Sequence, residues 1–218
     1  MEDYIGLDRK CEMLSSKRRL LQLFGKALRE PPQLLLLRSA LSIRSGSQEP
    51  WNWDIGRGAL QSAHYDYGYV SEREVKSGAV NPYPVIFDAG SDILDEEMIA
   101  ALSRYVEAGG IFIALHNTGR STPLAANSWP VSKLTGFNVT ACGKQGVVCF
   151  SNELPILKGW EGRQFRDEGH TVDWTNGRPR ATAIALRPAA SGTRALARWE
   201  DGSIAVGLRQ LGKGRVIV

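Results

Sequence analysis

A polar turn directly follows an apolar run in the stretch GIFIALHNTGR, residues 110–120. In many α/β enzymes a turn of this kind carries the nucleophile. Here it offers His116, Asn117 and Arg120, but no cysteine, and no serine before Ser121. A histidine in this position can serve as a general base, bind a metal ion or pack as a structural side chain. The residues therefore indicate a candidate site without a thiol or hydroxyl nucleophile of the usual kind.

The segments around this turn predict the elements that position it. Residues 34–37 and 85–89 read LLLL and VIFDA, and such continuous apolar runs are typical of strands buried on both faces. Between the second run and the strand 111–115, a single apolar stripe predicts a helix from Asp95 to Ala108, ended by Gly109-Gly110. This strand–helix–strand order predicts a βαβ unit in a parallel sheet.

Parallel strands place their carboxyl ends at one edge, where ligands of open sheets bind. We therefore expect His116, Asn117 and Arg120 to line a cleft with Asp88, which ends the strand before the helix. Asp88 is expected to fix the loop as an acceptor. Arg120 can grip a carboxylate or phosphate of a ligand, or it can pair with Asp88.

A long segment from Ser39 to Pro82 is rich in aromatic residues and weak in periodicity. Its rings can stack on the C–H faces of a sugar, or they can cover the sheet or meet another domain, since aromatic residues are enriched at interfaces. For a sugar site, the best candidates in this segment are Trp53, Asp54 and His64. The complete set of candidate ligand-binding residues is His116, Asn117, Arg120, Asp88, Trp53, Asp54 and His64.

The last third of the sequence has the character of β hairpins. A hairpin over 139–150 with a Gln145-Gly146 loop would place Cys142 opposite Cys149, as two reduced thiols or as a pair. Asp201-Gly202 predicts a type I′ turn between strands 194–199 and 203–208. With only three cysteines, we expect no disulfide framework.

Composition excludes several classes of function. The formal charge of +4 arises from 27 basic and 23 acidic residues that are scattered, so we expect no nucleic-acid partner. No apolar run reaches the ~20 residues of a membrane span. The N-terminus lacks the apolar core of a signal peptide, and the default compartment is the cytoplasm. The sequence has no CxxC pairs or clustered histidines, so we expect no metal site, and no cofactor is implied.

Two parts of unequal size are expected along the chain. Residues 1–31 form an N-terminal helical segment that Pro31-Pro32 ends. Residues 32–218 form one α/β domain. Because the apolar run 216–218 is cut short, we expect the sequence to be a fragment of a longer chain.

Two stretches carry a family resemblance. YPVIFDAGSDILDEEMIAALSRYVEAGGIFIALHNTG, residues 83–119, resembles the core βαβ unit of class I glutamine amidotransferase-like domains. It is most similar to the non-catalytic middle (trimerisation) domain of β-galactosidases and related large glycoside hydrolases. ALARWEDGSIAVGLRQLGKGRVIV, residues 195–218, resembles the closing hairpin and last strand of the same domains. The resemblance implies a three-layer flavodoxin-like fold: a mainly parallel central sheet with helices on both faces, and C-terminal β hairpins.

The chain departs from the working glutaminases of this family. They carry a Gly-x-Cys-x-Gly elbow after the equivalent strand, where helix-terminal N–H groups activate the thiol. Here Leu115, His116, Asn117 and Thr118 occupy those positions. The nearest counterpart of the partner His-x-Glu motif is His170-Thr-Val-Asp173, whose spacing is wrong. We therefore predict no glutaminase activity.

The resemblance and the missing nucleophile together favour one function. We expect a non-catalytic accessory domain of a carbohydrate-active enzyme, which serves assembly or lines a neighbouring active site. Its expected partners are the other domains of a longer parent chain, a carbohydrate ligand and further copies of itself in a homo-oligomer. The alternative is a stand-alone small hydrolase or sugar-processing enzyme of the trehalose-utilisation-like type that uses His116.

Overall fold

The computed structural model describes residues 32–45, 57–152, 155–168, 171–173, 178–180 and 182–218. The predicted helix in 1–31 lies outside these residues, as do Trp53 and Asp54. Residues Gln33–Val218 belong to one compact unit, and the fold described below is that of this unit.

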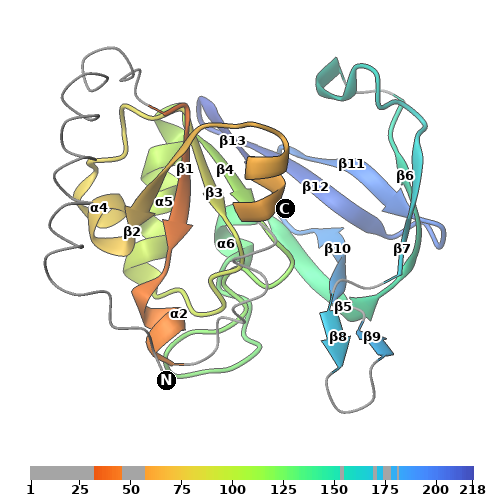
Figure 1. The fold of residues 1–218 in the computed structure, drawn as a ribbon, viewed down its shortest axis with the longest axis horizontal. Coiled ribbons are helices and arrows are strands. Elements are labelled where there is room, and N and C mark those ends of the chain that lie inside the picture. The colour runs from red at the N-terminus through yellow and green to blue at the C-terminus, as the bar shows by residue number, and fades with distance from the viewer. Residues whose placement is uncertain (1–31, 46–56, 153–154, 169–170, 174–177, 181) are drawn as a thin grey trace, which may run out of the picture. The chain divides into compact units, whose positions relative to one another are not determined.

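Five strands of this unit run parallel to one another (Figure 1). They are β2 (Tyr67–Ser71), β1 (Leu34–Arg38), β3 (Val85–Asp88), β4 (Ile111–Ala114) and β13 (Gly214–Ile217), in that spatial order. Each strand pairs in register with its neighbour, so the carboxyl ends of β1, β3 and β4 lie along one edge. The three strands predicted from their apolar runs are thus confirmed as parallel neighbours.

The sheet as a whole is mixed, so the prediction of a mainly parallel sheet is wrong. Beyond β13 it continues through antiparallel pairings, in the order β12 (Ile204–Leu211), β11 (Thr193–Trp199), β6 (Gly146–Phe150) and β7 (Gln164–Asp167). Two further strands extend from β12, namely β10 (Ala183–Pro188) and β5 (Phe137–Lys144). A separate two-stranded sheet contains β8 (Thr171–Asp173) and β9 (Arg178–Arg180).

Helices cover the parallel strands on both faces. The main helix, α5 (Glu96–Glu107), begins at Asp95, whose carboxylate accepts from Met98 N at 2.7 Å, close to the predicted boundary. Its buried stripe packs with the side chains of Leu35 and Leu37 and with α4 (Glu72–Ser77). On the other face, Leu36 packs with Leu60 from a helical segment at 57–62. Two short helices, α2 (Ala40–Arg44) and α6 (Ser132–Thr135), and the 3-10 turn η1 (Pro155–Leu157) complete the described helical elements.

The end of α5 approaches β13 closely. A Cβ atom on Gly214 would overlap the backbone oxygens of Gly110 and Val106. Only glycine therefore lets β13 pair with β4 where α5 ends, which places the last strand of the chain in the parallel part of the sheet.

The predicted hairpin over 139–150 does not form. β5 pairs with β10, so Cys142 lies opposite Ile184, while β6 pairs with β11, so Cys149 lies opposite Arg198. Both thiols are free. Gly143 and Gly146 have φ values of 72° and 131°, and the chain bends there from one pair of strands to another instead of folding back on itself.

The predicted hairpin of strands 194–199 and 203–208 is confirmed as β11 and β12, but the turn type is wrong. A type I′ turn needs positive φ at both central residues. In the observed turn, Gly202 N donates to Trp199 O at 2.9 Å. Of Asp201 and Gly202, only Gly202 has a positive φ, at 83°. The side-chain carboxylate of Asp201 accepts from Ser203 N at 3.0 Å, and this hydrogen bond stabilises the turn.

Candidate functional site

Asp88 forms the centre of the carboxyl edge. Its side chain is fully buried at the end of β3. It accepts from Ser91 N at 3.0 Å, from Ser91 Oγ at 2.6 Å and from Thr118 Oγ1 at 2.6 Å. Thr118 Oγ1 in turn accepts from Leu115 N at 3.1 Å. Asp88 therefore ties the loop after β3 to the turn after β4, which is the loop-fixing role expected from its position.

The environment of Asp88 perturbs its ionisation. Burial raises the pKa of its carboxyl, and the hydrogen bonds from Ser91 and Thr118 oppose that shift. The residue is 0% exposed, so no ligand in solvent reaches it without rearrangement of the loops. This burial suits a structural acceptor better than a group that contacts a ligand.

Asn117 lies in the same buried layer. Its Nδ2 donates to Gly90 O at 3.1 Å, whereas its Oδ1 has no partner among the described residues. Gly90 has a φ of 97°, and a Cβ atom there would overlap the Asn117 amide. Glycine at 90 therefore leaves the space in which Asn117 bridges the two loops.

Arg120 pairs with Asp92 and not with Asp88, so that alternative is wrong. Its Nε lies 2.7 Å from Asp92 Oδ1, in an ion pair that lacks hydrogen-bond geometry. Asp92 is almost fully buried, while 42% of the Arg120 side chain is exposed. The loops also join through the backbone, since Ser121 N donates to Asp92 O at 2.9 Å. Arg120 thus lies between solvent and the buried carboxylate of Asp92, where the loops after β3 and β4 meet.

His116 has different surroundings from Asp88, Asn117 and Arg120. It is half-buried and lines a cavity of about 400 Å³. The other residues of this cavity are Ile113, Ala114, Leu115, Ala183, Ile184, Ala205, Val206, Ile217 and Val218. Asp88, Asn117 and Arg120 are not among them, because β13, β12 and β10 supply most of the neighbours of His116 in this cavity. The cleft predicted to join these residues with His116 and part of the aromatic segment, which lies partly outside the described residues, stays a prediction.

His64 lies apart from these residues. It is exposed in the turn after the helical segment 57–62, with a φ of 57°, and its backbone N donates to Gln61 O at 3.1 Å. It is not among the residues that line the His116 cavity. Nearby, the rings of Tyr67 and Tyr69 meet edge to face at 5.6 Å on β2.

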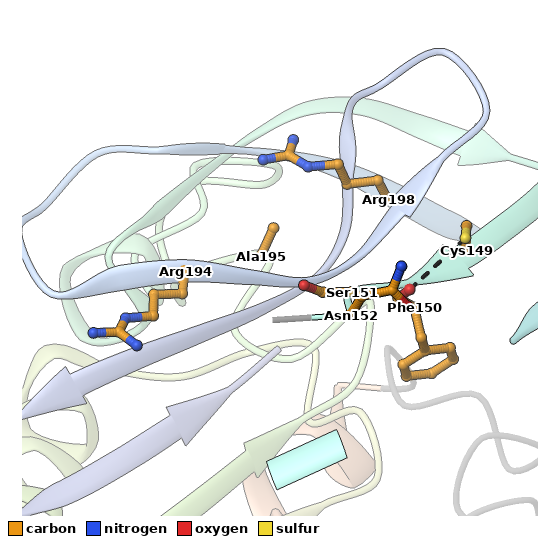
Figure 2. Close-up of a pocket in the computed structure, with 7 residues that line it drawn as sticks. All are labelled: Cys149, Phe150, Ser151, Asn152, Arg194, Ala195 and Arg198. Carbon is orange, nitrogen blue, oxygen red and sulfur yellow. Dashed lines mark hydrogen bonds between the residues drawn. The ribbon is translucent and has the colours of Figure 1, made fainter. Parts of the chain in front are cut away.

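The sequence analysis missed two surfaces on the antiparallel strands. The first is an exposed aromatic cluster of Phe150, Trp160 and Phe165, with Trp160 and Phe165 stacked at 5.6 Å. The second is a cavity beside β6 and β11 that contains Arg194 and Arg198 (Figure 2). In the sequence, the aromatic cluster is indicated only by the aromatic residues within 150–165. Their spacing matches neither a helix nor a strand, so the cluster was not predicted.

The described residues offer no site for a metal ion, because they contain no group of three or more suitable ligands. Among them, no helix has the length and apolarity to cross a membrane. Cys142 and Cys149 lie on β5 and β6, outside the turn after β4 where a glutaminase thiol would stand. No described cysteine can therefore replace the missing elbow nucleophile.

Solved structures with a similar fold include β-galactosidases and a ThuA-like protein. A β-galactosidase from Bacillus circulans sp. alkalophilus matches with a TM-score of 0.65 at 14% identity, over 99% of this chain and 32% of that chain. A GH42 β-galactosidase from G. stearothermophilus matches with a TM-score of 0.64 at 11% identity, over 96% and 30%. A ThuA-like protein from Bacteroides uniformis matches with a TM-score of 0.56 at 14% identity, over 87% and 82%.

These similarities concern the fold. The chain spans about a third of the length of the β-galactosidases that it matches. No family model and no curated protein sequence matches it. The resemblance seen in the sequence is thus supported at the level of the fold, while the specific domain type remains a proposal.

Proposed function

We propose that this chain is a non-catalytic, amidotransferase-like accessory domain of a glycoside hydrolase, closest in type to the trimerisation domain of β-galactosidases. The observation that carries the proposal is the coverage of the structural matches. Nearly the whole chain corresponds to about a third of each β-galactosidase. A chain that matches one part of a larger enzyme along its own full length is expected to serve as a part of such an enzyme.

The parallel strands support the finer assignment of the fold. Their spatial order, β2-β1-β3-β4-β13, corresponds to the order 2-1-3-4-5 of flavodoxin-like sheets. The antiparallel strands then form an insertion before the fifth parallel strand. This arrangement agrees with an amidotransferase-like core to which hairpins have been added.

The geometry at the carboxyl edge supports the lack of catalysis. A nucleophile needs an adjacent base, and the base needs an orienting group. Asp88 and Asn117 are buried and hold loops, Arg120 pairs with Asp92, and His116 lines an apolar cavity. We infer that these residues stabilise the loops and carry out no chemical step. The stand-alone enzyme that uses His116 is therefore not favoured.

The aromatic cluster supports a role in assembly. Trp160 and Phe165 are 47% and 44% exposed, and Arg163 lies over the Trp160 ring at 5.3 Å from its centroid. Tryptophan, phenylalanine and arginine are enriched in the cores of protein interfaces. We infer that this cluster contacts another copy of the chain or another domain of its parent, and that a carbohydrate meets the domain only where it borders a neighbouring active site.

Two measurements test this proposal. An antibody against this domain should detect, on a denaturing gel of the source cells, a polypeptide about three times as long as the 218 residues. A product of 23.9 kDa would instead support the stand-alone enzyme.

The second measurement is sedimentation of the chain and of a variant with Trp160→Ser and Phe165→Ser. The variant should dissociate at concentrations at which the wild type stays assembled. The matched control is Leu124→Ser, because Leu124 is 98% exposed and lies outside the cluster. Equal association of all three chains would contradict a contact between copies at this cluster and leave a contact with another domain of the parent as its role.

A further inference from the structure

The cavity beside β6 and β11 is distinct from the carboxyl edge and from the His116 cavity. Its volume is about 570 Å³, which lies within the range of sites for small molecules. Its lining consists of Cys149, Phe150, Ser151, Asn152, Arg194, Ala195 and Arg198 (Figure 2). Unlike the His116 cavity, it carries cationic and amide side chains.

Strand register explains why polar side chains gather here. Arg198 is the cross-strand partner of Cys149, and Cys149 is the partner of Gln164 on β7. Directly opposed residues of an antiparallel sheet point to the same face, so these three form one row. The next residue along β6, Val148, is buried in an apolar cluster on the opposite face. Cys149 and Arg198 therefore line the cavity from the polar face of β6 and β11.

Among the described residues, the charge at this cavity is unbalanced. Arg194 and Arg198 are both exposed, and neither forms an ion pair with a carboxylate of the described residues. Arg198 Nη1 donates to Gly202 O at 2.9 Å, which leaves its other N–H groups for a further partner. No described aspartate or glutamate lines the cavity.

We propose that this cavity binds a small anion, a carboxylate or phosphate group on a molecule of about the size of a sugar, through the guanidinium group of Arg194 or of Arg198. A planar guanidinium presents paired N–H donors that match the oxygens of either group. The amide of Asn152, which lines the same cavity, would bind neutral parts of the ligand. The inference stands independently of the proposed function.

Cys149 supplies a reporter inside the cavity. Iodoacetate and iodoacetamide alkylate a thiolate by the same displacement of iodide, but only iodoacetate is an anion. The same thiolate reacts with both reagents. The ratio of the two rates at one cysteine therefore does not depend on the exposure of that cysteine or on the fraction present as thiolate. Cys142 is the internal control, since it is an exposed thiol on β5 opposite the apolar Ile184.

The experiment is peptide-level mass spectrometry of the 218-residue chain after brief alkylation at low ionic strength. The arginines of the cavity should attract the anionic reagent and raise the iodoacetate-to-iodoacetamide ratio at Cys149 by a factor of roughly two to five over that at Cys142. Salt at about 0.5 M should remove the difference by screening. Arg194→Gln combined with Arg198→Gln should also remove it, while Arg187→Gln, an exposed arginine on β10, should not.

Competition then identifies the anion. Galacturonate, galactose 6-phosphate and inorganic phosphate are each tested as protectants of Cys149, with galactose as the neutral match. Protection by either charged sugar but not by galactose supports the proposal and separates carboxylate from phosphate. Equal ratios at the two cysteines, an effect that survives the double Arg variant, or equal protection by galactose would overturn it.

Discussion

Replacing Thr118 by valine should lower the free energy of unfolding by about 2–4 kcal/mol. Valine has nearly the same shape, so the change removes the hydroxyl and little else. That hydroxyl donates to the buried Asp88 carboxylate at 2.6 Å and accepts from Leu115 N at 3.1 Å. A hydrogen bond to a charged group contributes about 1.5–3 kcal/mol, and an N–H left without a partner costs about 1–3 kcal/mol. The range quoted allows for non-additivity within one network.

Thr182 provides the matched control for this substitution. Its Oγ1 is a buried atom with no hydrogen-bond partner among the described residues. Thr182→Val should therefore leave stability unchanged or raise it by up to about 1 kcal/mol, because a buried hydroxyl without a partner carries a desolvation cost.

The assay is urea unfolding of the wild type and both variants, with the free energy obtained by linear extrapolation. The reasoning requires a large loss for Thr118→Val and none for Thr182→Val. A loss below about 0.5 kcal/mol for Thr118→Val, or equal losses for the two variants, would refute the view that Asp88 and Thr118 fix the loops at the carboxyl edge.

Three further predictions follow from particular side chains. Burial raises the folded pKa of Asp88, so its contribution to stability is present below the unfolded pKa of about 4 and is lost as pH rises through the folded value. Relative to wild type, Asp88→Asn should thus gain stability between about pH 4 and 7 in a pH series of urea unfolding; a difference that is flat or of opposite sign would contradict this. Burial raises the pKa of Tyr105 to about 12, so wild type should lose stability between pH 10.0 and about 12, and Tyr105→Phe should abolish that loss in alkaline thermal melts. Gly214→Ala should cost more than about 3 kcal/mol or prevent folding, because backbone atoms would meet its Cβ, whereas Gly58→Ala, with nothing within 4 Å, should be neutral or stabilising; similar circular dichroism melts for both would count against the close approach of α5 and β13.

The parallel half of the fold was predictable because its signals are local. β1, β3 and β4 are continuous apolar runs, and α5 has one apolar stripe with an aspartate at its N-cap. β2 was not predicted, because its sequence YGYVS contains a glycine and alternating aromatic residues within a segment of weak periodicity. It is a strand because it pairs with β1 along its whole length.

The antiparallel half shows where local reasoning fails. Gln145-Gly146 has the composition of a hairpin loop, yet β5 and β6 pair with strands that lie later in the chain. Pairing with β10 and β11 depends on contacts between residues that lie about 40 to 50 positions apart in the sequence, which no local pattern encodes. The error over Cys142 and Cys149 has the same cause.

The candidate site was predictable only in part, for a related reason. Asp88 ends an apolar strand, and a carboxylate there commonly accepts from the following loop, as Asp88 does from Ser91. The partner of Arg120 depends on how two loops pack, and Asp92 is closer to it than sequence spacing indicates. The neighbours of His116 come from β10, β12 and β13, whose positions were not known from the sequence.

The proposal that this domain performs no chemistry is tested by measuring turnover by the chain itself. Hydrolysis of aryl β-galactosides, β-glucosides and β-mannosides, and release of glutamate from glutamine, would be measured for the wild type and for His116→Ala, with folding checked by circular dichroism. We expect both chains to be folded and both to convert every substrate no faster than buffer alone. Turnover by the wild type that His116→Ala abolishes, while the fold and assembly of the variant are intact, would instead make the turn after β4 an active site.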